Sequence, residues 1–420
     1  MEQLETWQFG INNDELVELV LEGNKTATTS LNNSKIPKIG ERSILTFENE
    51  KKACIVETKN VIITKFKDIT PEMAYLEGEG DRTLEYYKKV HIKYFKTINP
   101  DFNDDTEVIF EVFEVVEDLR KARLAIAEKV VEEYKEIFGS DNKHTITEIN
   151  AGFNNDIFDV DNKWVIKICA NNKEVEFEKE SKFYMQNRNS KHIPKLYKYD
   201  NSKIIINSVY EIIEKIEGKS LYYYWYKMTE NEREETIKEL ISILKEIHKS
   251  NDDTYDWAKY VKEKVLSYYE KVKKYFSSEE QRLIEKSFNE YDKYLSENQF
   301  AFIHNDLHFD NIIKNEKGLF LIDFNDAMVA PIDYEFRILY MCKDTPWKWA
   351  NIEMDPYQKQ EDYKNIDIYI KKYYEDFSKI EYIDKRMIIY RVLNDIGLLA
   401  RFDNDELKEN VLKYSSDLLK

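Results

Sequence analysis

Two hydrophobic periodicities alternate along the first third of the chain. Leu16, Leu19 and Val20 follow the spacing of one helical face, and a second helical stretch is expected at 83–95. Runs rich in β-branched and aromatic residues predict strands at 43–47, 53–58, 61–66 and 107–116. Short strands with a few helices are typical of a small α+β or barrel-like unit.

The pattern changes after the last of these predicted strands. Residues 119–138 are rich in Ala, Glu, Lys and Arg, which favour a helix, and the stretch ends at the turn 139–142. We place the domain boundary there. The chain is therefore predicted to comprise a first domain at 1–118, a helical linker at 119–142 and a second domain at 143–420.

The second domain begins with mixed patterning and becomes mostly helical. Its first part predicts two strands around a helix, at 164–169, 204–216 and 174–187 respectively. From Thr229 onward helical periodicity dominates, interrupted by two strand-like runs, 302–313 and 319–324. A small strand-rich lobe at about 143–216 therefore precedes a large helical lobe at about 217–420, and two lobes imply a cleft.

Composition narrows the choice of partners. The chain has 420 residues, more than one ordinary core holds, and 42% hydrophobic residues are enough to build sizeable interiors. Its formal net charge is −18. That charge argues against duplex DNA or an anionic membrane as a partner of the whole surface, and it leaves small molecules and cations.

Cysteine usage and the first residues bear on the compartment. The three cysteines lie far apart without CxxC spacing, so neither a disulfide framework nor a zinc site is expected, which favours a reducing cytoplasm. The residues after Met1 lack a basic stretch followed by an apolar one, and no run approaches the roughly 18 apolar residues of a membrane span. We expect neither export nor membrane insertion.

The most specific segment runs from His304 to Asn311 and is followed by an apolar strand that ends at Asp323. It places Asp306 five residues before an asparagine on a short loop. Hard oxygen ligands of this kind suit magnesium, which keeps part of its coordination shell for phosphate oxygens. One carboxylate then remains to orient an attacking hydroxyl.

These residues resemble the aminoglycoside phosphotransferase and choline kinase family, whose loop reads H-x-D-x-x-x-x-N. The resemblance implies a bilobal protein-kinase-like fold with a β-rich first lobe. It also implies that Asp306 is the catalytic base, that Asn311 and Asp323 hold magnesium, and that His304 shapes the loop. A lone aspartate is usually a turn or cap residue, but three matching positions in strand context favour the site.

The same resemblance assigns the groups that hold the nucleotide. Lys167, inside an apolar run, would hold the α- and β-phosphates, and Glu180 would be its ion-pair partner, with Glu176 as the fallback. Each glutamate alone is equally typical of a solvated helix face.

A turn and a hinge complete the nucleotide site. The turn 150–155, with Gly152 and Asn154, would cover the phosphates, although on its own such a turn is most often a plain hairpin. The segment 211–221, which contains Ile216, resembles the hinge between the lobes, where main-chain groups would pair with adenine.

The implied activity is a magnesium-requiring transfer of phosphate from ATP or GTP to a small hydroxyl-bearing acceptor. Six residues downstream of the metal aspartate suit a cationic or ring-bearing acceptor, or else are helix caps and core aromatics: Asp326, Asp333, Glu335, Asp344, Trp347 and Trp349. The alternative from another class is a pseudokinase-like module that senses nucleotide while the N-terminal domain does the chemistry.

The N-terminal domain carries its own motifs, a Gly-x-Lys-Thr-x-Thr run at 23–28 and a Glu-Gly-Glu-Gly-Asp loop at 77–81. They resemble the ASCH domain, a small PUA-like β-barrel with helices that is associated with RNA and nucleoside chemistry. Some ASCH relatives are acetylcytidine amidohydrolases with a Lys/Thr/Glu trio, which implies Lys25, Thr28 and Glu79 here, with Glu77 as the alternative carboxylate.

Other ASCH relatives bind RNA, so the resemblance implies a nucleoside or a short single-stranded RNA as ligand. The alternative is that Lys25 is a surface residue at a turn and that the glutamates cap the next helix.

Overall fold

The computed structural model describes residues 4–32, 35–140, 143–149, 155–169, 173–248, 254–296, 298–350, 353–402 and 404–420. It divides into two compact units. The first comprises residues up to 161 together with 166–171 and 202–208, and the second comprises the rest. The α+β class expected from the sequence is confirmed, whereas the exact domain boundaries stay a prediction.

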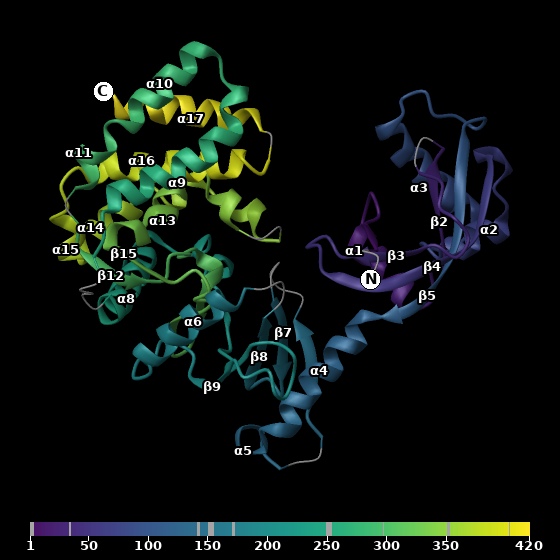
Figure 1. Ribbon diagram of the computed structural model, residues 1–420, viewed down its shortest axis with the longest axis horizontal. Coiled ribbons are helices and arrows are strands. Elements are labelled where there is room, and N and C mark those ends of the chain that lie inside the picture. The colour runs from purple at the N-terminus through teal and green to yellow at the C-terminus, as the bar shows by residue number, and fades with distance from the viewer. Residues whose placement is uncertain are drawn as a thin grey trace. The chain divides into compact units, whose positions relative to one another are not determined.

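A five-stranded sheet forms the centre of the N-terminal domain and curves as a half-barrel (Figure 1). Its strands run in the order β1-β3-β4-β5-β2 and span β1 (Glu5–Trp7), β2 (Ala27–Leu31), β3 (Arg42–Thr46), β4 (Lys52–Lys65) and β5 (Glu107–Asp118). The strands predicted at 53–58 and 61–66 are one strand, β4. The polar residues Lys59 and Asn60 lie at an irregularity of its pairing with β5 rather than in a turn.

Three helices cover this sheet and close two small cores: α1 (Asn13–Leu21), α2 (Pro71–Glu77) and α3 (Leu84–Ile98). Alternation along β2 sorts its side chains between the two faces. Ala27, Thr29 and Leu31 are buried, whereas Thr28 and Ser30 are partly exposed. The strand therefore contributes both to the core and to a surface cleft.

The predicted linker helix is broken in two, α4 (Leu119–Glu133) and α5 (Lys135–Phe138). Asp118 caps α4 by accepting the backbone N–H groups of Arg120 and Lys121. The helix ends at Tyr134, whose ψ of 54° is not helical. The side chain of Tyr134 is buried, so packing rather than helix propensity sets this break.

Five further strands run in the order β6-β7-β8-β10-β9: β6 (Ile146–Ile149), β7 (Asn155–Val160), β8 (Trp164–Cys169), β9 (Leu196–Asp200) and β10 (Tyr210–Glu214). Helix α6 (Glu174–Gln186) follows β8, as expected. The strand predicted at 204–216 is shorter than expected, because residues 204–208 form bends and the strand begins at Tyr210.

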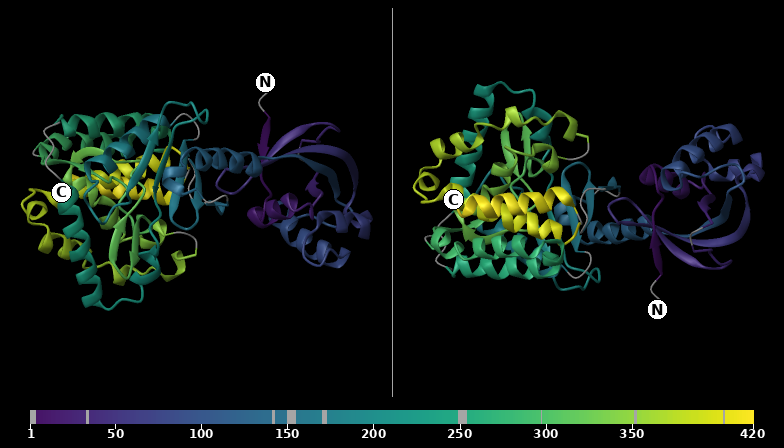
Figure 2. Two further views of the ribbon diagram at one scale, coloured as in Figure 1. Left: turned by 90° about the horizontal axis from the view of Figure 1, so that it is seen from below. Right: turned by 90° about the horizontal axis from the view of Figure 1, so that it is seen from above.

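The helical part of the second unit contains α7 (Tyr222–Trp225), α8 (Glu230–Ile247), α9 (Trp257–Val272), α10 (Ser278–Phe288), α11 (Tyr291–Leu295), α12 (Ile332–Glu335), α13 (Arg337–Met341), α14 (Ile366–Tyr373), α15 (Glu375–Ser378), α16 (Ile383–Leu399) and α17 (Asp405–Leu418). Helix α16 packs against both α9 and α17, and the two yellow helices α16 and α17 lie side by side in Figure 2. These helices and the strands beside them bury one continuous apolar core.

Short strands in the helical part hold the loops that carry the chemistry: β11 (Lys219–Ser220), β12 (Phe300–Ile303), β13 (Ile312–Asn315), β14 (Gly318–Leu321) and β15 (Met328–Pro331). The strand predicted at 302–313 is two strands separated by a loop, because β12 pairs with β15 whereas β13 pairs with β14. Across the described residues, every helix is too short or too polar to cross a lipid bilayer.

Candidate active site

The loop between β12 and β13 carries the predicted catalytic residues, and a buried glutamate anchors it. Glu335 of α12 accepts the backbone N–H of His304 at 2.7 Å and that of Asn305 at 2.9 Å. His248 Nε2 lies 3.1 Å from the same carboxylate. Glu335 is fully buried, and the His248 ring and these loop contacts hold its pKa below the ordinary value although burial raises it.

The ring of His304 links this loop to the segment that carries Asp323. Its Nε2 lies 2.8 Å from the carbonyl oxygen of Ile322, and its Nδ1 accepts the backbone N–H of Asp306 at 3.3 Å. The side chain is fully buried. These contacts fit the loop-shaping role implied by the resemblance.

Asp306 and Asn311 are brought into contact as predicted. Asn311 Nδ2 donates to the backbone oxygen of Asp306 at 2.9 Å and to its Oδ2 at 3.1 Å. The His308 ring lies 3.4 Å from the same Oδ2. Burial raises the pKa of Asp306, but the hydrogen bond and charge of His308, with His304 and Arg337, hold it below its ordinary value. The Asp306 carboxyl is therefore ionised at neutral pH.

Asp323 follows β14 in a left-handed backbone conformation, with φ of 63°. Asn325 Nδ2 donates to its Oδ1 at 2.6 Å. Glu180, buried on α6, accepts the backbone N–H of Phe324 at 3.3 Å and the Tyr184 hydroxyl at 3.1 Å. The predicted partner of Lys167 thus holds the backbone next to the predicted metal ligand.

The two predicted metal ligands are of the kind that magnesium prefers, although two side chains do not fill its coordination shell. Asn311 and Asp323 offer an amide oxygen and a carboxylate, both hard ligands. Within the described part of the chain, no group of three or more His, Cys, Asp and Glu side chains is arranged to hold a metal ion. Magnesium would therefore depend on nucleotide phosphates for part of its shell.

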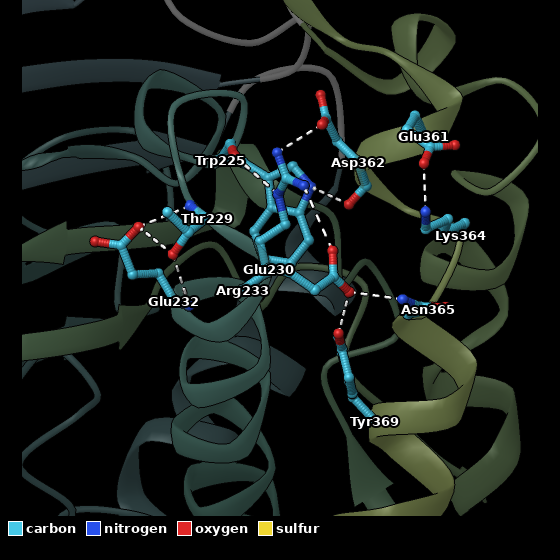
Figure 3. A network of polar contacts seen from close by, with 10 residues as sticks. All are labelled: Trp225, Thr229, Glu230, Glu232, Arg233, Glu361, Asp362, Lys364, Asn365 and Tyr369. Carbon is cyan, nitrogen blue, oxygen red and sulfur yellow. Dashed lines mark hydrogen bonds and ion pairs between the residues drawn. The ribbon is translucent and has the colours of Figure 1, made fainter.

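A network of polar contacts joins Trp225 and Arg233 to Asp362 (Figure 3), and Trp225 also packs against the loop of the predicted catalytic residues. The ring of Trp225 packs against Phe309, with centroids 4.7 Å apart, and its Nε1 donates to the backbone oxygen of Asp362 at 3.1 Å. Arg233 of α8 donates to Asp362 Oδ1 at 2.5 Å. Phe309 also stacks on Tyr363, so the network fixes the loop residue between His308 and Asp310.

The predicted nucleotide residues fall at separate places. Lys167 is buried in β8, and Ile216 lies between β10 and β11, in the predicted hinge. Gly152 and Asn154 lie outside the described residues. The pairing of Lys167 with Glu180 stays a prediction.

Two of the residues that were candidates for binding the phosphoryl acceptor point into the protein interior. Asp333 is bound by Arg386 at 2.7 and 2.8 Å, and both side chains are buried. Glu335 anchors the loop, as described above. Sequence reasoning missed these roles because the partners, Arg386 and His304, lie 53 and 31 positions away.

Asp326 remains available at the site. It is exposed, and both partial burial and the negative charges of Asp306 and Asp323 raise its pKa. The negative charges of Asp306, Asp323 and Asp326 together attract cations, so this side of the loop favours a positively charged acceptor or metal.

Lys25 of the N-terminal domain is buried, which makes the surface-residue alternative wrong. Its Nζ contacts the Glu77 carboxylate and lies 2.7 Å from Glu79 Oε1, with its side chain 1% exposed. Burial lowers the pKa of Lys25, but the two glutamates raise it further, so the amine stays protonated. A protonated amine is not a nucleophile.

Glu77 rather than Glu79 is the centre of this cluster. Thr29 donates to Glu77 Oε1 at 2.6 Å, and His91 Nε2 lies 3.7 Å from the same atom. Gly78, between the two glutamates, has φ of 71°, and a Cβ there would lie 2.2 Å from the backbone oxygen of Asn24. Glycine is therefore required where the loop turns its carboxylates inward.

Thr28 shares a cavity with this cluster. It lines a small cavity of about 60 Å³ together with Glu77, Glu79 and His91. The predicted trio is thus arranged as a buried Lys25–Glu79 pair with Thr28 at the cavity wall. Strand alternation is the signal that separates Thr28 from the buried Thr29.

Comparisons with known proteins find matches for two separate parts of the chain. Residues 5–117 match the model of the ASCH domain, and residues 145–364 match that of the phosphotransferase enzyme family. A search among proteins of curated function finds no significant match.

Solved structures resemble each part. ADP-bound aminoglycoside phosphotransferase APH(2'')-Ib is 19% identical, with 70% of this chain and 96% of that chain covered and a TM-score of 0.50. The enzyme in the GDP and kanamycin complex of APH(2'')-IIIa is 15% identical, with 70% of this chain and 99% of that chain covered and a TM-score of 0.50. At these identities the likeness concerns the fold. The ASCH domain from Lactobacillus crispatus JV V101 is 25% identical, covering 27% of this chain and 80% of that chain, with a TM-score of 0.27.

Proposed function

Because this chain belongs to the phosphotransferase enzyme family through residues 145–364, we propose that it transfers phosphate from ATP or GTP to an alcohol group of a small molecule, with magnesium. The two resemblances, to this family and to the ASCH domain, are confirmed. The contact between Asp306 and Asn311 carries the proposal.

Asp306 would orient the acceptor hydroxyl and accept its proton. Its carboxyl is ionised, and Asn311 fixes its direction through two hydrogen bonds. A positioned base of this kind is worth roughly 10²–10⁴ in rate. Since phosphoryl transfer has a loose transition state, the protein contributes mainly positioning and charge.

Asn311 and Asp323 would hold magnesium, which neutralises the charge on the phosphate oxygens. Two contacts support this role, because Glu180 accepts the backbone N–H of Phe324, the residue after Asp323, and Asn325 donates to the Asp323 side chain. Lys167, Gly152, Asn154 and Ile216 are proposed to hold the nucleotide. The ADP and GDP in the similar structures support a purine nucleotide donor of either kind.

A cationic acceptor suits the site best. Asp326 lies near Asp306 and Asp323, and partial burial together with the negative charge of these two carboxylates raises its pKa. Kanamycin, a polyamine alcohol, is bound by one enzyme of similar fold. We therefore place aminated sugars first among the acceptors to test. The presence of Asp306, Asn311 and Asp323, together with the contact between the first two, supports a kinase over the pseudokinase alternative.

The decisive experiment is thermal unfolding of the full chain with ATP or GTP, with and without magnesium. A nucleotide at 100 times its dissociation constant adds about 2.7 kcal/mol of stability. We expect a rise in melting temperature that requires magnesium. No rise with either nucleotide at saturating magnesium would end the kinase proposal. Aminated sugars, choline and nucleosides are then screened for stimulated nucleotide consumption.

A second function is proposed for the N-terminal domain, which would bind a nucleoside-sized ligand in the small cavity of Thr28 and Glu79 together with a wider cleft that Thr28 also lines. The observation that favours it is the cavity itself, lined by two threonines, two glutamates and the His91 ring. Lys25 would act by holding the glutamates in place rather than by contacting the ligand.

A further inference from the structure

A wider cleft adjoins the Thr28 cavity of the N-terminal domain. It measures about 430 Å³, a size typical of small-molecule sites, and Thr28 lines both spaces. Trp7, Phe9 and Tyr94 contribute ring surface to its walls. Flat apolar walls of this kind suit a planar ring.

Glu111 lies on the same side of the sheet as Thr28. The two residues are directly opposite each other in the pairing of β2 with β5, so their side chains project from the same face. Thr58 donates a hydrogen bond to Glu111 Oε1 at 2.6 Å. Glu111 lines the cleft and is partly buried, and burial raises the pKa of its carboxyl. A carboxylate in these surroundings favours a ligand that donates hydrogen bonds.

The charges around the cleft argue against a phosphate group. Four charged residues line it, the carboxylates Glu5, Glu41 and Glu111 and the single ammonium of Lys35. Lys35 is paired with Glu5 at 2.6 Å and with Glu41 at 2.8 Å. Its charge is thus already balanced, and the summed charge of the lining is negative. A phosphate would meet repulsion here, whereas a neutral or cationic ring would not.

We propose that this cleft binds an unphosphorylated planar ring that carries an amino group, and that Glu111 is the residue that recognises the amino group. The proposal rests on the ligand-binding role proposed above for the N-terminal domain and gives that role its ligand class. It excludes an RNA strand as the preferred ligand, because every nucleotide of RNA brings a phosphate.

Calorimetric titration of the full chain tests this with three probes: cytidine, uridine and cytidine 5′-monophosphate. Cytidine presents an amino group where uridine presents a carbonyl. Since hydrogen bonds to charged groups are strong, we expect cytidine to bind about tenfold or more tightly than uridine. The monophosphate is expected to bind more weakly than cytidine at low salt, and the gap should narrow as salt screens the charges.

The variant Glu111→Gln removes the charge and offers an amide that can donate to uridine. It should weaken cytidine binding and reduce the preference for cytidine over uridine. Glu114→Gln is the matched control, because Glu114 lies on the same strand with its side chain 57% exposed and paired with Lys59. It should bind all three probes as the parent does.

The outcomes separate this inference from the functions proposed above. If no probe binds, the ligand role of the N-terminal domain fails, while the magnesium-dependent nucleotide response still reports on the kinase. If cytidine 5′-monophosphate binds the parent protein as tightly as cytidine does, the negative charge of the cleft does not exclude phosphate, and that part of the proposal is overturned. An unchanged preference in a folded Glu111→Gln protein would overturn the role of Glu111.

Discussion

Glu335 accepts the backbone N–H of His304 at 2.7 Å, so a buried carboxylate of α12 holds the first residue of the loop that carries Asp306. The same side chain accepts the next backbone N–H and contacts His248. A carboxylate offers acceptors on both oxygens, which is what two neighbouring amide donors require. Loop geometry at the site therefore depends on a fully buried residue of another element.

Glu335→Gln should lower both stability and turnover. The substitution keeps the shape but turns one acceptor into a donor that faces a backbone N–H or the His248 ring. Loss of one buried hydrogen bond to a charged group costs about 1.5–3 kcal/mol. Thermal unfolding and steady-state kinetics check this, and we expect kcat to fall with little change in the nucleotide KM.

The control is Glu375→Gln, an exposed carboxylate in the first turn of α15. It should leave melting temperature and kcat within error of the parent. A Glu335→Gln protein with parental kcat would show that the anchor does not position the loop.

Asp306→Asn and Asp323→Asn should separate turnover from nucleotide binding. Asp306→Asn removes the base, so turnover should fall by roughly 10²–10⁴ while magnesium–nucleotide affinity stays close to that of the parent. Asp323→Asn removes a metal ligand, so magnesium-dependent nucleotide binding should be lost as well. Fluorescence or calorimetric titration of nucleotide with each variant measures this. Equal losses of binding in both variants would contradict the assigned roles.

Sequence alone predicts the parts of the site that are local. Asp306 and Asn311 lie five positions apart on one loop, and Asp323 ends the next strand, so the spacing is sufficient to expect them together. The contacts confirm that Asn311 faces Asp306. Local spacing also places α6 and β8 correctly.

The parts that depend on distant packing were predicted poorly. Glu335 was a candidate for binding the phosphoryl acceptor, because no residue near it in the sequence reveals that its side chain faces His304. Lys25 was equally typical of a surface turn, and only the approach of the loop with Gly78 shows that it is buried. Burial of a charged group is a tertiary property, so its partners cannot be read from a short motif.

The Lys25→Met substitution should lower the stability of the N-terminal domain. We do not expect it to abolish ligand binding while leaving the domain as stable as in the parent. It leaves Glu77 and Glu79 facing each other without the ammonium between them. Breaking a buried ion pair from one side costs about 3–5 kcal/mol. Urea denaturation of the full chain measures the loss, followed by hydrogen exchange of the backbone amides in that domain.

Lys35→Met is the matched control for this prediction. Lys35 also pairs with two glutamates, but its side chain is 61% exposed. Exposed ion pairs contribute about 0–1 kcal/mol, so this variant should denature close to the parent. Similar losses in both variants would contradict the argument from burial.

A second charge cluster lies within the first compact unit, where α4 meets β6. Arg123 binds Glu148 through two nitrogens, at 2.7 and 3.2 Å, and Lys51 Nζ lies 2.6 Å from the same carboxylate. Burial raises the pKa of Glu148, but Arg123 and Lys51 lower it further, so the folded-state value is below the ordinary one. This pairing fixes β6, the strand that precedes the predicted phosphate-covering turn.

Glu148→Gln should therefore destabilise the protein at pH 7 and not at low pH. A carboxyl with a depressed folded-state pKa contributes stability above its unfolded value of about 4.3, and the contribution is lost as pH falls through the folded-state pKa. We expect a loss of about 1–3 kcal/mol at pH 7, since the pair is partly screened by solvent. Urea denaturation at pH 7 and at successively lower pH should show the free energies of unfolding of parent and variant converging below about pH 4.

The control is Glu132→Gln, because Glu132 is exposed on α4, the helix that carries Arg123. This variant should have the free energy of unfolding of the parent at every pH. A Glu148→Gln deficit that persists unchanged into acid would mean that the side chain acts through packing rather than through its charge.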